Sequence, residues 1–384
     1  MNTNCGLMLL GFFVCLQGGG DPPENRIEKR EVGNIELELF RNSSSMSQVV
    51  AINSHESIVG TREILEESGA SLRSVPFYAG IHGMKDIPVP AGFTNLEVVA
   101  ISDNDLVIGY ATRIRKNPDG ALRGVVWNSN SDQFSFLPRG DGDDVNHAQD
   151  ISADGKRITG YTTGPNRLRP ALWKRDESSG EWLITVLSSE YDDNPFLMSG
   201  QLRISPNGKW IAGCCTEDFR PDGTIDSALF LWKENESGEW ERTKLSSQEI
   251  YLRGINDLGE MAGSIPGPKG ERRPCFVAPS GGLVLLGLLP NDVSGQANDI
   301  NNSSVIVGFS DDPIGGEGGP EPCVWSKDGK AKRFANSGIL YGTILGVNDS
   351  GQMVGAIEVS PDISSSDVTT TADEDLLLGF RTVK

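Results

Sequence analysis

The sequence predicts an all-β fold, a seven-bladed β-propeller in which an N-terminal strand closes the last blade. One phrase of about ten residues recurs seven times, separated by 45 to 53 residues, a period typical of solenoids, propellers and arrays. With 46 Gly and 21 Pro in 384 residues and 37% hydrophobic residues, the composition favours a β-rich repeat domain. The copies begin at Ile52, Ile101, Ile151, Ile204, Ile255, Ile300 and Val347.

Each copy of the phrase predicts a β-hairpin. The Ile or Val ends an apolar stretch and is followed by Asn or Ser, whose side chains bond to nearby backbone and start turns. Four copies place Gly at the fifth position, where a hairpin turn commonly needs a residue that tolerates positive φ. These glycines are Gly155, Gly208, Gly259 and Gly351. A second β-rich stretch then ends in Gly in all seven copies, which gives two strands per unit.

Two further apolar runs follow in most units and predict a third and a fourth strand. The third runs are PFYAGI from Pro76, GVVW to Trp127, ALW to Trp173, LFLW to Trp232, CFVA from Cys275 and CVW to Trp325. The fourth runs begin at Lys85, Phe134, Trp182, Trp240, Leu283 and Ala331. Four strands per unit are typical of a propeller blade.

The seventh unit has only LLLGFRTVK, Leu376–Lys384, after its hairpin and therefore lacks a fourth strand. The segment IELELF, Ile35–Phe40, precedes the first copy, alternates apolar and charged residues and belongs to no unit. We expect it to complete the last blade, because closure protects edges that an open β array would expose. The predicted propeller spans residues 35–384.

The repeat phrase resembles the extracellular repeat family called HAF, in which Ile-Asn-x-x-Gly-x-Val-Val-Gly precedes an aromatic-Leu-Trp strand and a Leu-rich strand. The segments LPRGDGDDVNHAQDISADGKRITG and GLLPNDVSGQANDINNSSVIVG match best. The first unit departs from the pattern at His55 and Glu56, and the His-Ala-Phe tripeptide is replaced by PALW, SALFLW and PCVW. The resemblance implies a secreted or surface-located bacterial propeller of undefined activity, and it supplies no catalytic residues.

Residues 1–20 predict export. An apolar core of about eleven residues, Gly6–Leu16, is too short to span a bilayer and suits a signal peptide, although no Lys or Arg precedes it. Cys15 allows a lipid anchor as an alternative, and a buried or disordered stub is the third interpretation. Residues 21–34 are predicted to be a flexible linker. We expect a secreted or cell-envelope protein without a transmembrane span.

Charge and cysteine positions exclude several classes of partner and site. The net charge of −19 opposes binding to nucleic acid and to anionic membranes. Cys275 and Cys323 lie at matching places in adjacent units, too far apart for the roughly 4.4–6.8 Å Cα separation of a disulfide. Cys214 and Cys215 are adjacent, so we expect buried thiols. Three isolated histidines and no CxxC spacing make a zinc site unexpected.

The densest group of candidate ligands lies in the loop RGDGDDVNHAQD. Asp141, Asp143, Asp144 and His147 could bind a cation or a partner, and carboxylates are the ligands that Ca²⁺ prefers. An EF-hand is excluded because the bidentate Glu at position twelve is missing. The main hypothesis is therefore a non-catalytic binding module that holds a protein, a glycan or a cation through an acidic loop face, with Ca²⁺ as the one cofactor considered.

Two alternatives stay open: a propeller hydrolase or lyase acting on polysaccharide at the central channel, and a structural envelope or matrix component. Carboxylates converging from successive blades, such as Asp144 and Asp193, could support the enzymatic alternative. The chain has no G-x-S-x-G elbow, P-loop or HExxH motif, and no catalytic residue is assigned. The recurring third-run tryptophans are expected to pack the blades.

Overall fold

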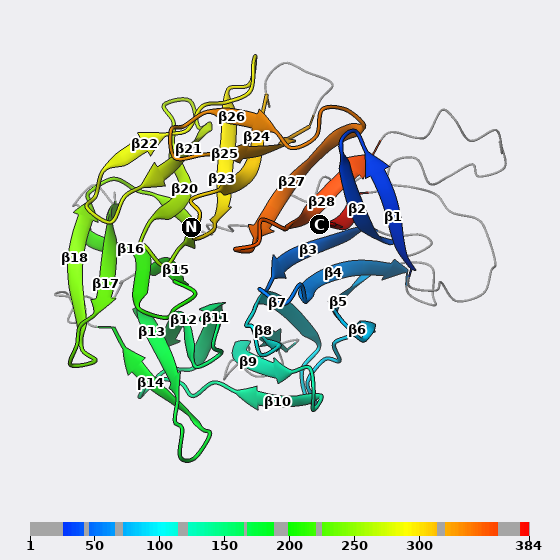
Figure 1. The fold of residues 1–384 in the computed structure, drawn as a ribbon. Helices are drawn as coiled ribbons and strands as arrows, with labels where there is room; N and C mark the ends of the chain where they lie inside the picture. Colours follow the sequence, from blue (N-terminus) through cyan, green and yellow to red (C-terminus); the bar gives the residue numbers. More distant parts are fainter. Residues whose placement is uncertain are drawn as a thin grey trace.

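The computed structural model describes residues 26–41, 46–65, 72–113, 122–164, 167–187, 199–219, 225–312, 319–359 and 377–383. These residues form 29 strands in seven antiparallel sheets that surround a central axis (Figure 1). The predicted seven-bladed β-propeller is confirmed. The described part of the chain contains no helix, and so none long and apolar enough to cross a membrane.

Each of the first three blades contains four strands in sequence order. Blade one contains β3 (Ser47–Ile52), β4 (Ile58–Leu65), β5 (Leu72–Gly80) and β6 (Gly83–Asp86). Blade two contains β7 (Asn95–Ile101), β8 (Leu106–Thr112), β9 (Leu122–Asn128) and β10 (Gln133–Phe136). Blade three contains β11 (Val145–Ile151), β12 (Arg157–Gly164), β13 (Arg167–Arg175) and β14 (Trp182–Val186).

The next three blades repeat this order. Blade four contains β15 (Ser199–Ile204), β16 (Trp210–Phe219), β17 (Ile225–Glu234) and β18 (Trp240–Ser246). Blade five contains β19 (Tyr251–Ile255), β20 (Met261–Pro266), β21 (Arg272–Val277) and β22 (Leu283–Leu285). Blade six contains β23 (Ser294–Ile300), β24 (Ile306–Asp311), β25 (Glu321–Trp325) and β26 (Ala331–Arg333). In each blade the first strand lies nearest the axis (Figure 1).

Blade seven joins the two ends of the chain, as the sequence predicts. Its order from the axis outward is β27 (Ile339–Val347), β28 (Met353–Val359), β29 (Leu378–Thr382), β2 (Ile35–Arg41) and β1 (Arg26–Val32). Strand β2 pairs antiparallel with β29, with Leu37 opposite Thr382 and Phe40 opposite Gly379. Arg381 pairs with Glu38 across the same joint. The ring therefore closes through backbone pairing between segments more than 300 residues apart in sequence.

Strand β1 corrects the predicted linker, residues 21–34, over residues 26–34, and residues 21–25 lie outside the described part of the chain. Its residues form a hairpin with β2 through a turn at Gly33, and Val32 is buried in the core of blade seven. The pattern RIEKREV has few apolar positions because β1 is the outermost strand, with one face toward solvent. Its strand conformation follows from pairing with β2, which the residue pattern of 26–32 does not show.

The repeated turn connects each first strand to its second strand and also links neighbouring blades. In blade one the side-chain oxygen of Asn53 accepts the backbone N–H groups of His55 and Ser57, as predicted for a turn-starting Asn. Its amide N–H group donates to the Ser102 carbonyl of blade two at 3.0 Å. The same bond to the next blade recurs in three more turns, from Asn256 to Asn301, Asn301 to Asn348 and Asn348 to Asn53. These amides therefore connect blades five, six, seven, one and two in a chain of hydrogen bonds.

The fifth position of this turn has positive φ in every copy. The predicted glycines have φ between 67° and 81°, and the non-glycine residues Glu56, Asp105 and Ser304 have 68°, 58° and 57°. The turn geometry is thus imposed by the hairpin even where the side chain does not favour it.

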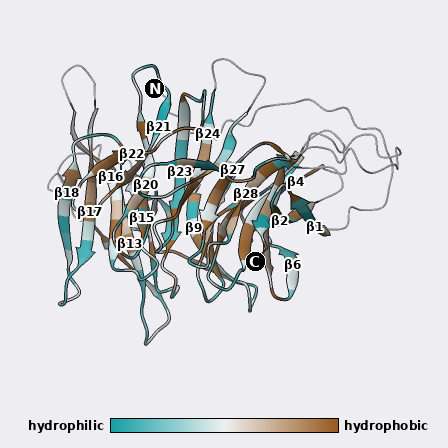
Figure 2. Ribbon diagram, turned by 45° about the horizontal axis from the view of Figure 1, so that its top comes forward, coloured by the Kyte–Doolittle hydropathy of each residue, from teal (hydrophilic) through white to brown (hydrophobic). Residues whose placement is uncertain are grey.

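The hydrophobic core is divided among the interfaces between blades. Seven buried clusters each combine residues from adjacent blades, and brown apolar segments lie within the sheets in Figure 2, with teal turns at the ends. The third-strand tryptophans Trp127, Trp173, Trp232 and Trp325 are at most 2% exposed, so the predicted packing role is confirmed. The indole N–H of Trp173 donates to the Pro138 carbonyl of the preceding blade at 2.8 Å.

The four cysteines that the structure describes, Cys214, Cys215, Cys275 and Cys323, are buried free thiols, as predicted. Burial raises the pKa of each of them to about 12, so they are protonated at neutral pH. Cys15 and the predicted signal peptide lie outside the described residues. Export and lipid attachment stay predictions.

Candidate functional site

The residue immediately before the repeat Ile or Val lies on the first strand of each blade, next to the axis. Four blades have a small residue there, and blades three, four and six have a charged one. In chain order the seven residues are Ala51, Ala100, Asp150, Arg203, Gly254, Asp299 and Gly346. The axis therefore carries two carboxylates and a guanidinium at one level of the ring.

The two carboxylates each bridge to the next blade. Asp150 accepts the backbone N–H groups of Ile151 and Ile204 at 2.9 and 3.0 Å. Asp299 accepts those of Ile300 and Val347 at 2.8 and 2.9 Å. Gly254 has no side chain because an added Cβ would press against Asp299. Both Asp residues are half-buried at the axis.

The surroundings raise the pKa of both carboxyl groups. Burial is the main cause for Asp150, and burial with a smaller repulsion from Asp150 raises the pKa of Asp299 to about 7. The backbone N–H groups and the Arg203 guanidinium act in the opposite direction. Asp299 can therefore exchange a proton near neutral pH.

This pKa predicts a pH-dependent stability. The folded state holds the Asp299 proton between about pH 4 and 7, where the unfolded chain releases it, so stability falls as pH rises through this range. We expect this carboxyl to account for about 1–3 kcal/mol of the free energy of unfolding, less than the full pKa shift would give, because the residue as a whole is half-buried. Asp299→Ala introduces the residue that blades one and two have at this position. In urea unfolding, the free energy of unfolding should decrease less between pH 4.5 and 7.5 in this variant than in the wild type. Equal decreases in both proteins would contradict this assignment.

Beside this level, an aromatic stack joins blades two and three. The ring of His147 on β11 lies between Tyr110 of β8, with ring centroids 4.0 Å apart, and Tyr161 of β12, at 4.9 Å. The His147 and Tyr161 rings are parallel to within 10°. The Tyr110 hydroxyl donates to Glu97 of β7. The repeat glycine of blade three, Gly160, lies against the His147 carbonyl oxygen, as Gly109 and Gly308 lie against first-strand carbonyls of their own blades.

The stack holds its titratable groups neutral. Burial, with a smaller effect of the Arg203 charge, lowers the pKa of His147 to about 4, so its imidazole is uncharged at neutral pH. The Nδ1 atom is buried, and the described residues provide no hydrogen-bond partner for it. Burial raises the pKa of Tyr161, and burial together with Glu97 raises that of Tyr110. Both phenols are therefore protonated.

Arg203 connects the stack to the carboxylates. Its guanidinium donates to the Gln149 carbonyl at 2.9 Å, and its charge acts on His147, Asp150 and Asp299. The side-chain oxygen of Gln149 accepts the N–H of Leu202 at 2.9 Å, which fixes the adjoining first strands. A neutral base, two phenol donors, a fixed cation and two carboxyl groups thus occupy one region near the axis.

Of the residues that the sequence singles out, only His147 belongs to this region. Asp143 is buried and its Oδ2 atom accepts from Thr162 at 2.8 Å and from Arg169 at 2.5 Å. Asp141 and Asp144 are exposed, and the Asp144 carbonyl accepts from Arg139. Asp193, the partner considered for Asp144, lies outside the described residues.

The described residues contain no group of three or more His, Cys, Asp or Glu side chains that could hold a metal ion. The Asp143 carboxylate is neutralised by Arg169, which reduces its ability to bind a cation. Calcium binding by the acidic loop stays a prediction.

Sequence reasoning missed Tyr110, Asp150, Tyr161, Arg203 and Asp299. A signal for the charged residues is present when the seven copies are aligned, because the position before the repeat Ile is Ala or Gly in four of them. A charged residue at a place that otherwise has a small side chain indicates a role other than packing. The tyrosines follow the repeat Gly in two successive copies, where the other five have Thr61, Cys214, Ser264, Phe309 and Ala356.

The chain matches no protein-family model and no curated protein. Its fold is similar to the β-propeller domain of the Trilobed protease from Pyrococcus furiosus, with a TM-score of 0.55, 10% identity and coverage of 92% of this chain and 94% of that one. It is also similar to an oligogalacturonate lyase in complex with manganese, with a TM-score of 0.52, 12% identity and coverage of 94% and 96%. At these identities the likeness establishes the propeller fold alone, and membership of the HAF family stays a prediction.

An acylaminoacyl peptidase from Pyrococcus horikoshii gives a TM-score of 0.52 at 12% identity. The alignment covers 82% of this chain and 49% of the peptidase, so this chain spans about half the length of that protein. The fold and the site together define the class of this protein as a seven-bladed propeller with a cluster of polar, titratable side chains at its axis.

Proposed function

We propose that this propeller is an enzyme that acts on an acidic polysaccharide at its axis, and that it cleaves the chain by β-elimination. The stack of His147 between two tyrosines beside Arg203 carries the proposal. It provides the three elements that elimination from a uronate requires: a neutral base, a cation for the carboxylate and a protonated acid.

Each residue has a defined role in the proposed reaction. Arg203 pairs with the uronate carboxylate and stabilises the negative charge that develops when the neighbouring carbon loses its proton. His147 accepts that proton from C5. The C4–O bond then breaks as the C4–C5 double bond forms, and the leaving oxygen takes a proton from Tyr161. Tyr110, bonded to Glu97, holds the imidazole ring in place.

The electrostatics of the site favour this assignment. An imidazole with a pKa of about 4 is a weak base in the free protein, partly because Arg203 lies near it. A bound carboxylate would offset the charge of Arg203 and raise the pKa of His147 when substrate is present. The base would therefore become stronger in the complex, where proton transfer takes place.

The enzymatic alternative has more support than the binding module predicted from the acidic loop. Asp143 of that loop is already engaged by Arg169, whereas the axis brings together groups from four blades. Among the structures of similar fold, an oligogalacturonate lyase has nearly the same length as this chain, which supports a catalytic role for a propeller of this size. The export predicted from residues 1–20 would place the protein where polysaccharides occur.

The test is incubation of the purified protein with polygalacturonate, with alginate and with a neutral glucan. Elimination creates an unsaturated uronate that absorbs in the ultraviolet, and hydrolysis creates reducing ends without this absorbance. We expect absorbance and reducing ends to increase together with an acidic polymer only. Reducing ends alone would establish a hydrolase instead. Binding of an acidic polymer without any product would support the non-catalytic module.

A further inference from the structure

Three arginine side chains gather on blades two and three. Arg113 follows the last residue of β8, Arg123 is the second residue of β9, and Arg139 lies in the segment between β10 and β11. Arg113 and Arg139 are exposed, and Arg123 is half-buried. These three residues are called the arginine patch below. No step of the proposed reaction uses them.

Two stacked phenyl rings hold two of the guanidinium groups in place. The ring centroids of Phe93 and Phe136 lie 5.4 Å apart. The guanidinium carbon of Arg113 lies 4.4 Å from the centroid of the Phe93 ring. That of Arg123 lies 5.4 Å from the centroid of the Phe136 ring. Stacking on a ring covers the flat face of a guanidinium and leaves its in-plane N–H groups available to an anion.

The described residues do not neutralise these charges. The side chains of the patch contact the two phenyl rings and two backbone carbonyls, and Arg139 donates to the carbonyl of Asp144, not to its carboxylate. Burial, together with repulsion from Arg139 and Arg113, lowers the pKa of Arg123. Residues 114–121 lie outside the described part of the chain, and their sequence contains two basic residues and one acidic one. The patch therefore carries an uncompensated positive charge.

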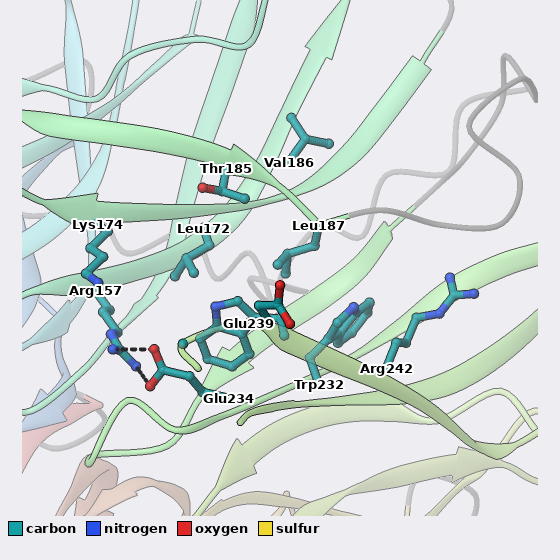
Figure 3. Close-up of a pocket in the computed structure, with 12 residues that line it drawn as sticks. Arg157, Leu172, Lys174, Thr185, Val186, Leu187, Trp232, Glu234, Glu239 and Arg242 are labelled. Carbon is teal, nitrogen blue, oxygen red and sulfur yellow. Dashed lines mark hydrogen bonds and ion pairs between the residues drawn. The ribbon is translucent and has the colours of Figure 1, made fainter. Parts of the chain in front are cut away.

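Several other arginines of this chain have a carboxylate partner. At the cavity of about 430 Å³ between blades three and four, Arg157 donates to both carboxylate oxygens of Glu234 at 2.8 Å (Figure 3). The same pairing joins Arg62 to Asp86, Arg169 to Asp143 and Arg381 to Glu38. Like charges that lie together without such partners repel each other, so the patch favours an anionic ligand.

The patch adjoins the candidate site at the axis. Strand β8 carries both, since Tyr110 contacts the His147 ring and Arg113 follows three residues later. Arg123 lies opposite Ala111, the residue after Tyr110. Because β8 runs toward the end of the ring at which β9 and β11 begin, the patch and the stack share that end. A polymer bound at His147 can therefore reach the patch as it leaves the axis.

We propose that the arginine patch binds further uronate carboxylates of the acidic polysaccharide that is cleaved at the axis, an inference that rests on the proposed function. A chain of net charge −19 repels a polyanion over most of its surface, so such a substrate needs a local positive region beside the reacting sugar. Guanidinium groups pair with carboxylates through parallel N–H bonds. Phe136, which is 40% exposed, adds apolar surface for the C–H groups of a sugar ring.

Calorimetric titration with galacturonate oligosaccharides tests the patch, in the His147→Ala background so that the sugar is not cleaved. Arg113→Gln combined with Arg139→Gln removes the two exposed guanidinium groups. This patch variant should bind a decasaccharide about tenfold more weakly, and the loss for a trisaccharide should be much smaller. Lys174→Gln combined with Arg175→Gln is the matched control, because it removes two exposed positive charges at the opposite end of blade three. The control variant should bind both sugars like the background protein.

The result is separable from that of the proposed reaction. If the wild type cleaves no polysaccharide but the patch variant binds the decasaccharide more weakly than the control variant does, the patch stands and the reaction fails. Equal decasaccharide affinity of the two variants, both folded by thermal melting, would overturn the patch even if the wild type is a lyase. Equal affinity of the background protein for a neutral glucan decasaccharide would overturn it as well.

Discussion

Removal of residues 26–41 should lower the free energy of unfolding by about 5–8 kcal/mol, because three side chains of β2 become fully buried when blade seven closes. Leu37 and Leu39 are 0% exposed and Phe40 is 2% exposed. Deletion would also leave the edge of β29 unpaired, and unpaired edges promote aggregation. Thermal melting and urea unfolding of a chain that begins at Ser43, compared with a chain that begins at Arg26, would measure the loss. Unchanged stability would show that β2 does not close the ring.

A pair of point variants separates burial from chain length. Leu37→Asp places a charge in the core of blade seven and should reproduce most of the effect of the deletion. Glu36→Ala changes the adjacent residue, whose side chain is 53% exposed, and should alter stability by less than about 0.5 kcal/mol. Similar melting of both variants and the wild type would contradict the packing of β2.

Replacement of His147 by Ala should reduce kcat/KM on an acidic polysaccharide by about 10²–10⁴, the usual contribution of a positioned base. Arg203→Lys keeps the charge but loses the planar guanidinium and should raise KM and lower kcat. Since His147 accepts a proton only when neutral, wild-type activity should fall as pH decreases toward about 4. Tyr161→Phe should lower kcat without changing the pH at which this fall occurs.

The control for these variants is Asp144→Asn, which changes an exposed carboxylate of the preceding loop and should leave the kinetics unchanged. Thermal melting checks that His147→Ala remains folded. Full activity in a folded His147→Ala protein would exclude this residue as the base. A large loss with Asp144→Asn would move the site to the acidic loop.

Much of the fold is predictable because each blade repeats the same local chemistry. The turn after Asn53 or Ser102, the repeat glycine within the second strand and the tryptophan of the third strand are local features that recur seven, seven and four times. Strand β1 escaped prediction because its conformation depends on pairing with β2 and not on its own pattern. The links between Asn amides and neighbouring turns also depend on the closed ring.

The site is less predictable because its members come from separate blades. Density of acidic residues pointed to Asp141, Asp143 and Asp144, yet the nearest neighbours of Asp143 are Thr162 and Arg169 on other strands. His147 and Tyr110 are 37 residues apart in sequence but in ring contact, since the propeller places β8 beside β11. Comparison of the seven copies with one another would have revealed Asp150, Arg203 and Asp299, because the other copies have small residues there.

Histidine NMR tests the central claim, that His147 lies in a site for an acidic sugar. The chain has three histidines, His55, His82 and His147, so their imidazole signals can be assigned by substitution. We expect the His147 signal to titrate near pH 4 in the free protein and to shift on addition of a galacturonate trisaccharide, with its pKa raised, while the other two signals stay unchanged. A His147 signal that does not respond to the saccharide at saturating concentration would contradict the account.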